Sequence, residues 1–493
     1  MASKEPSGEN VTTRTAMASA ALVAARLFSK SIDLILLLIL ARILVPEDFA
    51  LIAMAMIFIQ FTEAILEIPV VQAIIRAPKI TDQMLDTAFT ISFLRALLVM
   101  GIVCGAAPLA VVIFDEPRLG PLMMVLSLSP ALRGLVNPRL VIFARALNYG
   151  PEASIEVIAK FITTCVALPL AIVTESYWSL AIMTVVTPVT MMIGSYIYAP
   201  YRPRLTLRKW SVFSNMIGWT SISQIFVAAN WQVDIFALAR GVNADIVGKY
   251  SISQTLAGAP YQVLIIPIMR PFIAAFTELK TPAAMAPAYL KASSAIATLM
   301  APVLILVAAL AGPIVTLVFN EAWDGAGQFL SVLALSAIIS LPVLPVASVV
   351  LALDKAKFNA MHAFVGLSFK APLLFLGLYY YGVIGFLAGH VIAMTIWTIV
   401  GIMIVRALIG VRFRDQIIAM SHAVIGGVAM VAIAAALQAY IDYSSAVYLS
   451  LSIAVVGTFA FLGYWLSVFV VWSLRGKPDG IERLISTTLM KLL

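Results

Sequence analysis

Long apolar runs, separated by short stretches rich in proline, glycine and charged residues, dominate the chain. A helix needs about 20 mostly apolar residues to cross a bilayer, and these runs reach that length. The stretches between them are too short to hold a soluble domain. We therefore predict fourteen transmembrane helices, at residues 15–44, 47–72, 84–114, 119–143, 150–174, 178–199, 211–239, 246–276, 287–319, 327–352, 357–380, 383–407, 416–440 and 445–473.

The composition agrees with this pattern. Of the 493 residues, 62% are hydrophobic and 11% are charged, whereas about 25% of the residues of a soluble domain are charged. The fold class that we predict is therefore an all-α polytopic membrane protein. Cys104 and Cys165 both lie in apolar runs, which gives no indication of a disulfide framework. We expect no cleaved signal peptide, because no short apolar core with a cleavage site follows the polar residues 1–14.

Lysine and arginine gather in alternate loops between the predicted helices. Cytoplasmic loops of membrane proteins carry such an excess, so the net charge of +8 reports topology rather than nucleic-acid binding. Both termini are then predicted to be cytoplasmic. Four basic residues fall in the longest of the basic loops, residues 200–210, after the sixth predicted helix.

Short sequences recur in the same order in the two halves of the chain. Leu40-Ala-Arg42, which ends the first predicted helix, matches Leu238-Ala-Arg240 after the seventh, and Phe114-Asp-Glu116 matches Phe319-Asn-Glu321. A repeat of six helices keeps its orientation, so its halves are related by a pseudo-two-fold axis along the membrane normal. We predict a cytoplasmic tail (1–14), an N-lobe of helices one to six (15–199), a cytoplasmic linker (200–210), a C-lobe of helices seven to twelve (211–407), two extra helices (408–474) and an amphipathic cytoplasmic tail (475–493).

Charged residues inside the predicted helices are the candidate functional residues. Arg26, Lys30 and Asp33 lie on one face of the first helix, and Glu63 and Glu67 lie on one face of the second. A charge at the centre of a membrane helix costs about 2.5–3.5 kcal/mol on insertion scales, so these faces must point into the protein or a wet cavity. Two interpretations stay open. The cations bind an anionic ligand such as a phosphate, or they form ion pairs with these carboxylates.

Three further charges are candidates of the same kind. Arg270 lies between two prolines in the eighth predicted helix, which suits either a bent helix that lines a cavity or an interfacial arginine. Arg133 lies in the fourth helix and is a candidate ligand for the same anion. Asp234, in the seventh, is either a proton or cation site or the partner of a cation on a neighbouring helix.

Other polar residues favour structural roles. Glu152, Glu156 and Lys160 are spaced for salt bridges at a helix end. Lys370, His362 and His390 lie in the eleventh and twelfth helices, where we expect contacts between helices. The chain has no phosphate-binding loop, no cysteine and histidine cluster with metal spacing, and no nucleophile elbow. We therefore predict no cofactor and no metal.

The sequence Leu-Ala-Arg-x-Leu-x-Pro-x-Asp-Phe at residues 40–49, together with fourteen helices in a 6+6+2 layout, resembles the multidrug/oligosaccharidyl-lipid/polysaccharide (MOP) superfamily. Within it, the chain is most similar to the polysaccharide-transporter branch, the Wzx-type flippases. The resemblance implies a location in the bacterial inner (plasma) membrane. It also implies a polyprenyl-diphosphate-linked oligosaccharide as substrate, and a polysaccharide polymerase and chain-length regulator as partners.

The hypothesis from the sequence is thus a flippase that moves oligosaccharide repeat units outward by alternating access for exopolysaccharide synthesis. One alternative is a multidrug or cation antiporter of the same superfamily, with Asp33 or Asp234 as its coupling carboxylate. A second alternative is a membrane glycosyltransferase or polymerase. The short loops disfavour an enzyme, because they leave no room for an external catalytic segment.

Overall fold

The computed structural model describes residues 27–77, 79–146, 148–214, 219–265, 272, 275–279, 281–476 and 482–483. The regular secondary structure of these residues is helical throughout, which confirms the all-α prediction. Contacts divide the chain into two compact units, Met1–Ala228 and Ala229–Leu493. The lobe and linker boundaries predicted above remain predictions.

Ten helices among the described residues are long and apolar enough to cross a membrane. A bent pair of shorter helices, Leu119–Gly134 and Pro138–Arg145, makes an eleventh if it is counted as one span. The protein is therefore a multi-pass membrane protein. The number fourteen stays a prediction, because part of the chain lies outside the described residues and one of the ten helices is itself folded into two arms.

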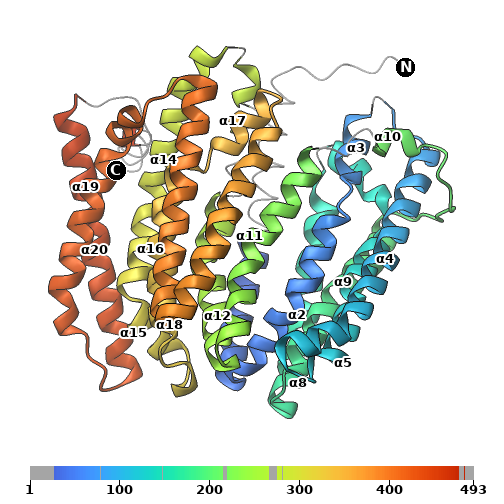
Figure 1. The fold of residues 1–493 in the computed structure, drawn as a ribbon, viewed down its shortest axis with the longest axis horizontal. Coiled ribbons are helices and arrows are strands. Elements are labelled where there is room, and N and C mark those ends of the chain that lie inside the picture. The colour runs from blue at the N-terminus through green and yellow to red at the C-terminus, as the bar shows by residue number, and fades with distance from the viewer. Residues whose placement is uncertain are drawn as a thin grey trace. The chain divides into compact units, whose positions relative to one another are not determined.

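The first unit begins with a helix at residues 27–43. It continues with α2 (Pro46–Ile65), α3 (Val70–Arg76), α4 (Asp82–Phe114), α5 (Leu119–Leu126), α6 (Leu128–Gly134), η1 (Pro138–Leu140), α7 (Val141–Arg145), α8 (Gly150–Thr174), α9 (Trp178–Tyr198), α10 (Trp210–Ser214) and the start of α11 (Trp219–Gly241) (Figure 1).

The rest of α11 opens the second unit. It is followed by α12 (Ala244–Pro260), η2 (Tyr261–Ile265), α14 (Pro282–Ala309), α15 (Ala311–Val318), η3 (Glu321–Trp323), α16 (Ala326–Ser340), η4 (Leu341–Val343), α17 (Val346–Ala352), α18 (Lys357–Ile409), α19 (Phe413–Leu437), η5 (Gln438–Tyr440) and α20 (Ala446–Leu474). In Figure 1, α19 and α20 run side by side, as their many mutual contacts require.

Side-chain oxygens mark the starts of several long helices. Thr81 accepts a hydrogen bond from the Met84 amide at 3.3 Å before α4, and Ser445 accepts one from Tyr448 at 3.3 Å before α20. Asn243 and Thr281 act in the same way before α12 and α14. Such a cap satisfies a backbone N–H group that has no partner within the helix, which sets where the helix begins.

The fourth predicted span is broken. The chain bends by 49° between Leu119–Gly134 and Pro138–Arg145, and Pro138 cannot donate a backbone hydrogen bond across that break. The Asn137 side chain forms hydrogen bonds with backbone groups at this break. Its side-chain oxygen accepts a hydrogen bond from the Arg139 amide at 2.9 Å, and its amide nitrogen donates to the carbonyls of Ser195 and Ala199 in and beyond α9.

The predicted linker, residues 200–210, lies along α4 and is hydrogen-bonded to it. The backbone amides of Arg204 and Thr206 donate to side chains of α4, the first to Asp86 at 3.2 Å and the second to Thr90 at 2.9 Å. The Tyr201 hydroxyl also donates to the buried Asp86 carboxylate. Burial and this hydrogen bond raise the pKa of Tyr201 well above its ordinary value.

α18 is two helical arms joined at Gly382, whose φ of 61° and ψ of −147° are accessible to glycine but not to other residues. The arms, residues 357–381 and 383–409, correspond to the eleventh and twelfth predicted helices. They touch through glycines. A Cβ atom on Gly377 would overlap the Gly385 carbonyl oxygen, and one on Gly389 would lie 2.5 Å from the Leu373 carbonyl oxygen. Small residues thus allow the two backbones into contact.

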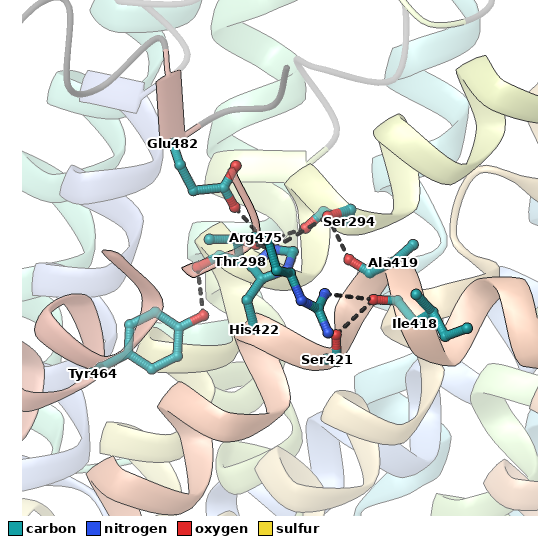
Figure 2. Close-up of polar contacts among 9 residues, drawn as sticks. All are labelled: Ser294, Thr298, Ile418, Ala419, Ser421, His422, Tyr464, Arg475 and Glu482. Carbon is teal, nitrogen blue, oxygen red and sulfur yellow. Dashed lines mark hydrogen bonds and ion pairs between the residues drawn. The ribbon is translucent and has the colours of Figure 1, made fainter. Parts of the chain in front are cut away.

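A polar cluster joins α14, α19, α20 and the C-terminal segment (Figure 2). The His422 Nε2 atom lies 2.9 Å from the Thr298 hydroxyl and 2.8 Å from the Glu482 carboxylate. The Tyr464 hydroxyl donates to the Thr298 carbonyl at 2.9 Å. Glu482, at 4% exposure, therefore holds part of the predicted amphipathic tail against the two extra helices. Most of that tail lies outside the described residues.

We expect Gly377→Ala to destabilise the protein by about 1–3 kcal/mol, because the new methyl group would overfill the contact between the arms. Thermal unfolding of the purified protein in detergent measures this. Gly258→Ala is the matched control, since a Cβ atom there meets nothing within 4 Å. Gly258 lies in α12, and replacing it with alanine should leave the free energy of unfolding unchanged or raise it by up to about 1 kcal/mol. Equal melting temperatures for the two variants would contradict close arm packing.

Candidate functional site

The first unit contains a cavity of about 440 Å³ lined by charged side chains. This volume lies within the range of about 300–1,000 Å³ that is usual for ligand pockets. The cavity is formed by α2 and the segment after it, α4, α6 and the first part of α11. Its polar lining consists of Glu63, Glu67, Ser92, Arg95, Arg133 and Gln224.

Arg95 of α4 is tied to both cavity carboxylate residues. Its Nη2 atom donates to Glu67 Oε2 at 2.9 Å and to the backbone carbonyl of Glu63 at 3.3 Å. Its Nε–H group is buried and has no hydrogen-bond partner in the described part of the chain. A buried donor without a partner is costly, so this group is available to an incoming acceptor.

Arg133 of α6 faces the other carboxylate. Its Nη2 atom lies 3.2 Å from Glu63 Oε2, and about half of its side chain, 49%, stays exposed. The cavity therefore holds two guanidinium groups and two carboxylates, and it is neutral as a whole when both carboxylates are ionised. Neutralisation of this kind is what allows four charges to lie among apolar helices.

A close helix contact brings the two arginines together. A Cβ atom on Gly134, next to Arg133, would overlap the Ala96 side chain of α4 and lie 2.6 Å from the Ser92 carbonyl oxygen. Only glycine permits this approach of α6 to α4. As a result, Arg133 on one helix and Arg95 on the other share one cavity.

A second group of charges lies on the first helix and α8. Asp33 Oδ1 is 2.7 Å from Lys160 Nζ, and Asp33 Oδ2 is 3.6 Å from Lys30 Nζ. Both lysines thus share one carboxylate. The expectation of a helix-end role for Lys160 missed this contact, because the partner is on another helix.

Asp234 lies in the second unit. It is fully buried, with its carboxylate 2.5 Å from Lys370 Nζ and 3.0 Å from His390 Nδ1. Lys370 lies on the first arm of α18, and His390 lies on the second. Arg26 and Arg270 lie outside the described residues, so their predicted roles stay predictions.

The structure brings Glu63, Glu67 and Arg133 together, and it adds Arg95, which the sequence analysis did not single out. The signal for Arg95 was present in the sequence. It is an arginine inside a long apolar run, the same feature that marked Arg26 as a candidate. Its pairing with Glu67 could not be predicted, because Arg95 lies on α4 and Glu67 lies in the segment between α2 and α3.

The cavity can offer its two guanidinium groups to an anionic ligand. An anion with several oxygens can replace the carboxylates as the acceptor for the Arg95 and Arg133 guanidinium groups. Arginine suits phosphate because its planar fork presents several donors at once. Among the described residues, no group of three or more histidine, cysteine or acidic side chains is placed to hold a metal ion.

Comparison with known families identifies one that matches most of this chain. A family described as "Polysaccharide biosynthesis protein" matches residues 39–328, more than half of the 493 residues. The chain belongs to this family. Its membership confirms the resemblance to polysaccharide transporters that the 40–49 motif indicated.

Two proteins with related sequences are named for roles in polysaccharide synthesis. The succinoglycan biosynthesis transport protein ExoT of Rhizobium meliloti is 26% identical over 308 residues, a match that covers 62% of each chain and so less than two thirds of ExoT. The lipopolysaccharide biosynthesis protein WzxC of Escherichia coli is 22% identical over 406 residues, 79% of this chain and 80% of WzxC.

Solved structures show the fold. The lipid II flippase MurJ in an inward closed conformation matches with a TM-score of 0.71 at 13% identity, over 91% of this chain and 98% of that one. A multidrug-resistance transporter of the MATE family, in the MOP superfamily, matches with a TM-score of 0.54 at 15% identity, over 78% and 98%. These matches confirm the MOP-type helical fold.

We expect the cavity to admit water and charged reagents. In a protein with Cys104 and Cys165 replaced by alanine, Ser92→Cys should react with a charged, water-soluble thiol reagent, because Ser92 lines the cavity. Thr163→Cys is the control, since Thr163 is 2% exposed and hydrogen-bonded to Thr187 between α8 and α9. Mass spectrometry of the purified protein measures labelling. Equal labelling of the two cysteines would mean that the reagent reaches a buried position as readily as the cavity, and it would contradict a water-filled cavity at Ser92.

Proposed function

We propose that this protein is a flippase that moves polyprenyl-diphosphate-linked oligosaccharide repeat units across the bacterial inner membrane. The observation that carries the proposal is the first-unit cavity, where Arg95, with 27% of its side chain exposed, and the half-exposed Arg133 line one space. The diphosphate would replace Glu63 and Glu67 as the acceptor for these guanidinium groups. The relatives named for polysaccharide transport and the MurJ-like fold support this class of substrate.

The ion pairs suit a site that must both fill and empty. In the empty protein the carboxylates neutralise the arginines, so the cavity carries no net positive charge that would hold an anion permanently. When the diphosphate arrives, Arg95 gains an acceptor for its unpartnered Nε–H group. Return of the carboxylates to the arginines would then promote release on the other side.

The electrical gradient favours outward movement of such an anion. An inside-negative membrane potential contributes about 2.3 kcal/mol per charge per 100 mV. A polar cavity is needed as well, because burying an unpaired hydroxyl of the sugar in hydrocarbon costs several kcal/mol. Alternating exposure of the hydrated cavity would remove that barrier.

The lipid tail needs a separate apolar path. A groove of about 550 Å³ in the second unit lies between α14, α15 and α20, and its lining includes Leu306, Leu310, Ile453 and Phe461. We assign the polyprenyl chain to this surface. The proposal also includes Lys30, Arg26 and Arg270 as further cations on the headgroup path, cytoplasmic termini, and a polymerase and chain-length regulator as partners.

The alternative function is multidrug or cation antiport, for which the likeness to the MATE-family fold provides a specific observation. The cavity chemistry weighs against it. A cationic drug would have to displace Arg95 and Arg133 from the carboxylates and leave two partly buried guanidinium groups without their counter-ions, which is costly.

We expect deletion of the gene to abolish surface polysaccharide and to accumulate diphosphate-linked repeat units on the inner leaflet. Complementation with Arg95→Ala or Arg133→Ala should restore export roughly tenfold less well than the wild type, because each variant removes charge-assisted hydrogen bonds worth about 1.5–3 kcal/mol. Export is measured as surface polysaccharide per cell at equal protein levels, with Arg26→Ala and Lys30→Ala tested in parallel.

Arg139→Ala is the matched control. Arg139 belongs to the same unit but lies outside the cavity, where it donates to the Pro200 carbonyl at 2.9 Å. It should complement nearly as well as the wild type. Unchanged polysaccharide in the deletion strain, together with altered drug sensitivity, would reject the flippase proposal in favour of the antiporter.

A further inference from the structure

The linker between α9 and α10, residues 200–210, carries charge and apolar surface that the proposed flippase mechanism does not use. It contains four basic residues and no acidic one. Three large apolar side chains lie among them and are exposed, Leu205 by 67%, Leu207 by 48% and Trp210 by 42%. The basic side chains, which are all exposed, are those of Arg202, Arg204, Arg208 and Lys209.

Backbone hydrogen bonds hold this linker against the start of α4 (Figure 1). Three of its amides donate to side chains of that helix: Arg204 to Asp86 at 3.2 Å, Thr206 to Thr90 at 2.9 Å and Lys209 to Thr87 at 3.3 Å. Because these bonds use the main chain, they leave the basic side chains available. Within the described part of the chain, none of the four forms a salt bridge with a carboxylate.

The length of α4 places the linker at the level of the lipid headgroups. The helix has 33 residues and is about 50 Å long, whereas the hydrocarbon core of a bilayer is about 30 Å thick. Residues 91–114 hold a single charge, that of Arg95, and are long enough to cross this core. Asp86, Thr87 and Thr90, which bind the linker, come before this stretch. The linker therefore lies just outside the hydrocarbon.

An anionic phospholipid matches both kinds of side chain in the linker. Arginine presents several N–H donors to phosphate oxygens, and each basic residue near an anionic membrane surface adds to the attraction. Leucine and tryptophan are stable at the boundary between headgroups and acyl chains. A soluble phosphate would use the cations but leave Leu205 and Leu207 in water. A zwitterionic lipid would lack the net charge that attracts the cations.

We propose that the linker is a binding site for anionic phospholipids. Their phosphodiester groups accept hydrogen bonds from the four basic side chains, while Leu205 and Leu207 contact the acyl chains. No residue of the linker lines the first-unit cavity, so this site is separate from the proposed diphosphate site. The proposal therefore stands or fails independently of the flippase function.

Lipid binding is measured by native mass spectrometry of the purified full-length protein, titrated in detergent with phosphatidylglycerol or phosphatidylcholine. The linker variant replaces the four basic residues: Arg202→Gln, Arg204→Gln, Arg208→Gln and Lys209→Gln. It should bind phosphatidylglycerol at least about tenfold less tightly than the wild type at low salt, because each basic residue contributes about fivefold. Phosphatidylcholine binding should not change. The backbone bonds to α4 stay intact, and the melting temperature without lipid checks the fold.

A charge-matched control variant replaces four exposed basic residues of the second unit: Lys291→Gln, Lys355→Gln, Lys357→Gln and Arg406→Gln. It should keep its phosphatidylglycerol affinity to within about threefold, because isolated surface charges lack the apolar side chains of the linker. Equal losses in the two variants overturn the proposal, since binding would then follow the net charge of the protein alone.

A spin label tests the position of the linker without removing any charge. Leu205→Cys, in a protein with Cys104 and Cys165 replaced by alanine, is labelled and reconstituted in phosphatidylglycerol vesicles. Its relaxation should respond more to oxygen, which dissolves in acyl chains, than to a water-soluble nickel chelate. Lys355→Cys, at an exposed turn, should show the reverse. A label at residue 205 that responds mainly to nickel overturns the proposal, because the linker is then a solvated surface.

Inorganic phosphate separates a lipid from a soluble anion. Phosphatidylglycerol should raise the melting temperature of the wild type but not that of the linker variant, because a ligand stabilises the folded state that binds it. Inorganic phosphate at the same concentration should leave both melting temperatures unchanged. If phosphate stabilises the wild type as strongly as the lipid does, and fails to stabilise the linker variant, the ligand is a soluble anion and the lipid proposal is rejected.

Discussion

Every described charge cluster in this protein depends on one constraint, that a charge among membrane helices must have a partner. Arg95 is held by Glu67, Arg133 by Glu63, Lys160 by Asp33 and Lys370 by Asp234. Lipid offers no water to stabilise a lone ion, so each of these pairs fixes one helix against another. The same pairs are the polar groups available for transport, because opening a pair exposes both of its charges.

Glycine contacts make this pairing possible. Gly134 lets α6 approach α4, and the glycines at residues 377, 385 and 389 let the two arms of α18 touch. Close backbones bring short and long polar side chains on different helices within hydrogen-bond distance. The positions of the charges are therefore set by small residues that carry no chemistry themselves.

The two units use their charges differently. The first-unit cavity is lined by charges of both signs, with one arginine side chain 27% exposed and the other 49% exposed, and we propose that it binds a large anionic headgroup. The Asp234 group of the second unit is buried. The sequence marked Asp234 as either a coupling residue or an ion-pair residue. The structure gives Asp234 two contacts, Lys370 and His390, and its coupling role stays a prediction.

The sequence by itself determined the class of the fold, its membrane character and its family. These follow from apolar run lengths, the scarcity of charge and the motif at residues 40–49, which are local properties of the chain. It also marked Glu63, Glu67, Arg133 and Asp234, since a charge inside an apolar run is visible without a structure. Only the tertiary structure decided which charges meet. Arg95 of α4 pairs with Glu67 in the segment after α2, and Lys370 of α18 pairs with Asp234 of α11. Helix periodicity describes one face of one helix and does not identify the segment that packs on it.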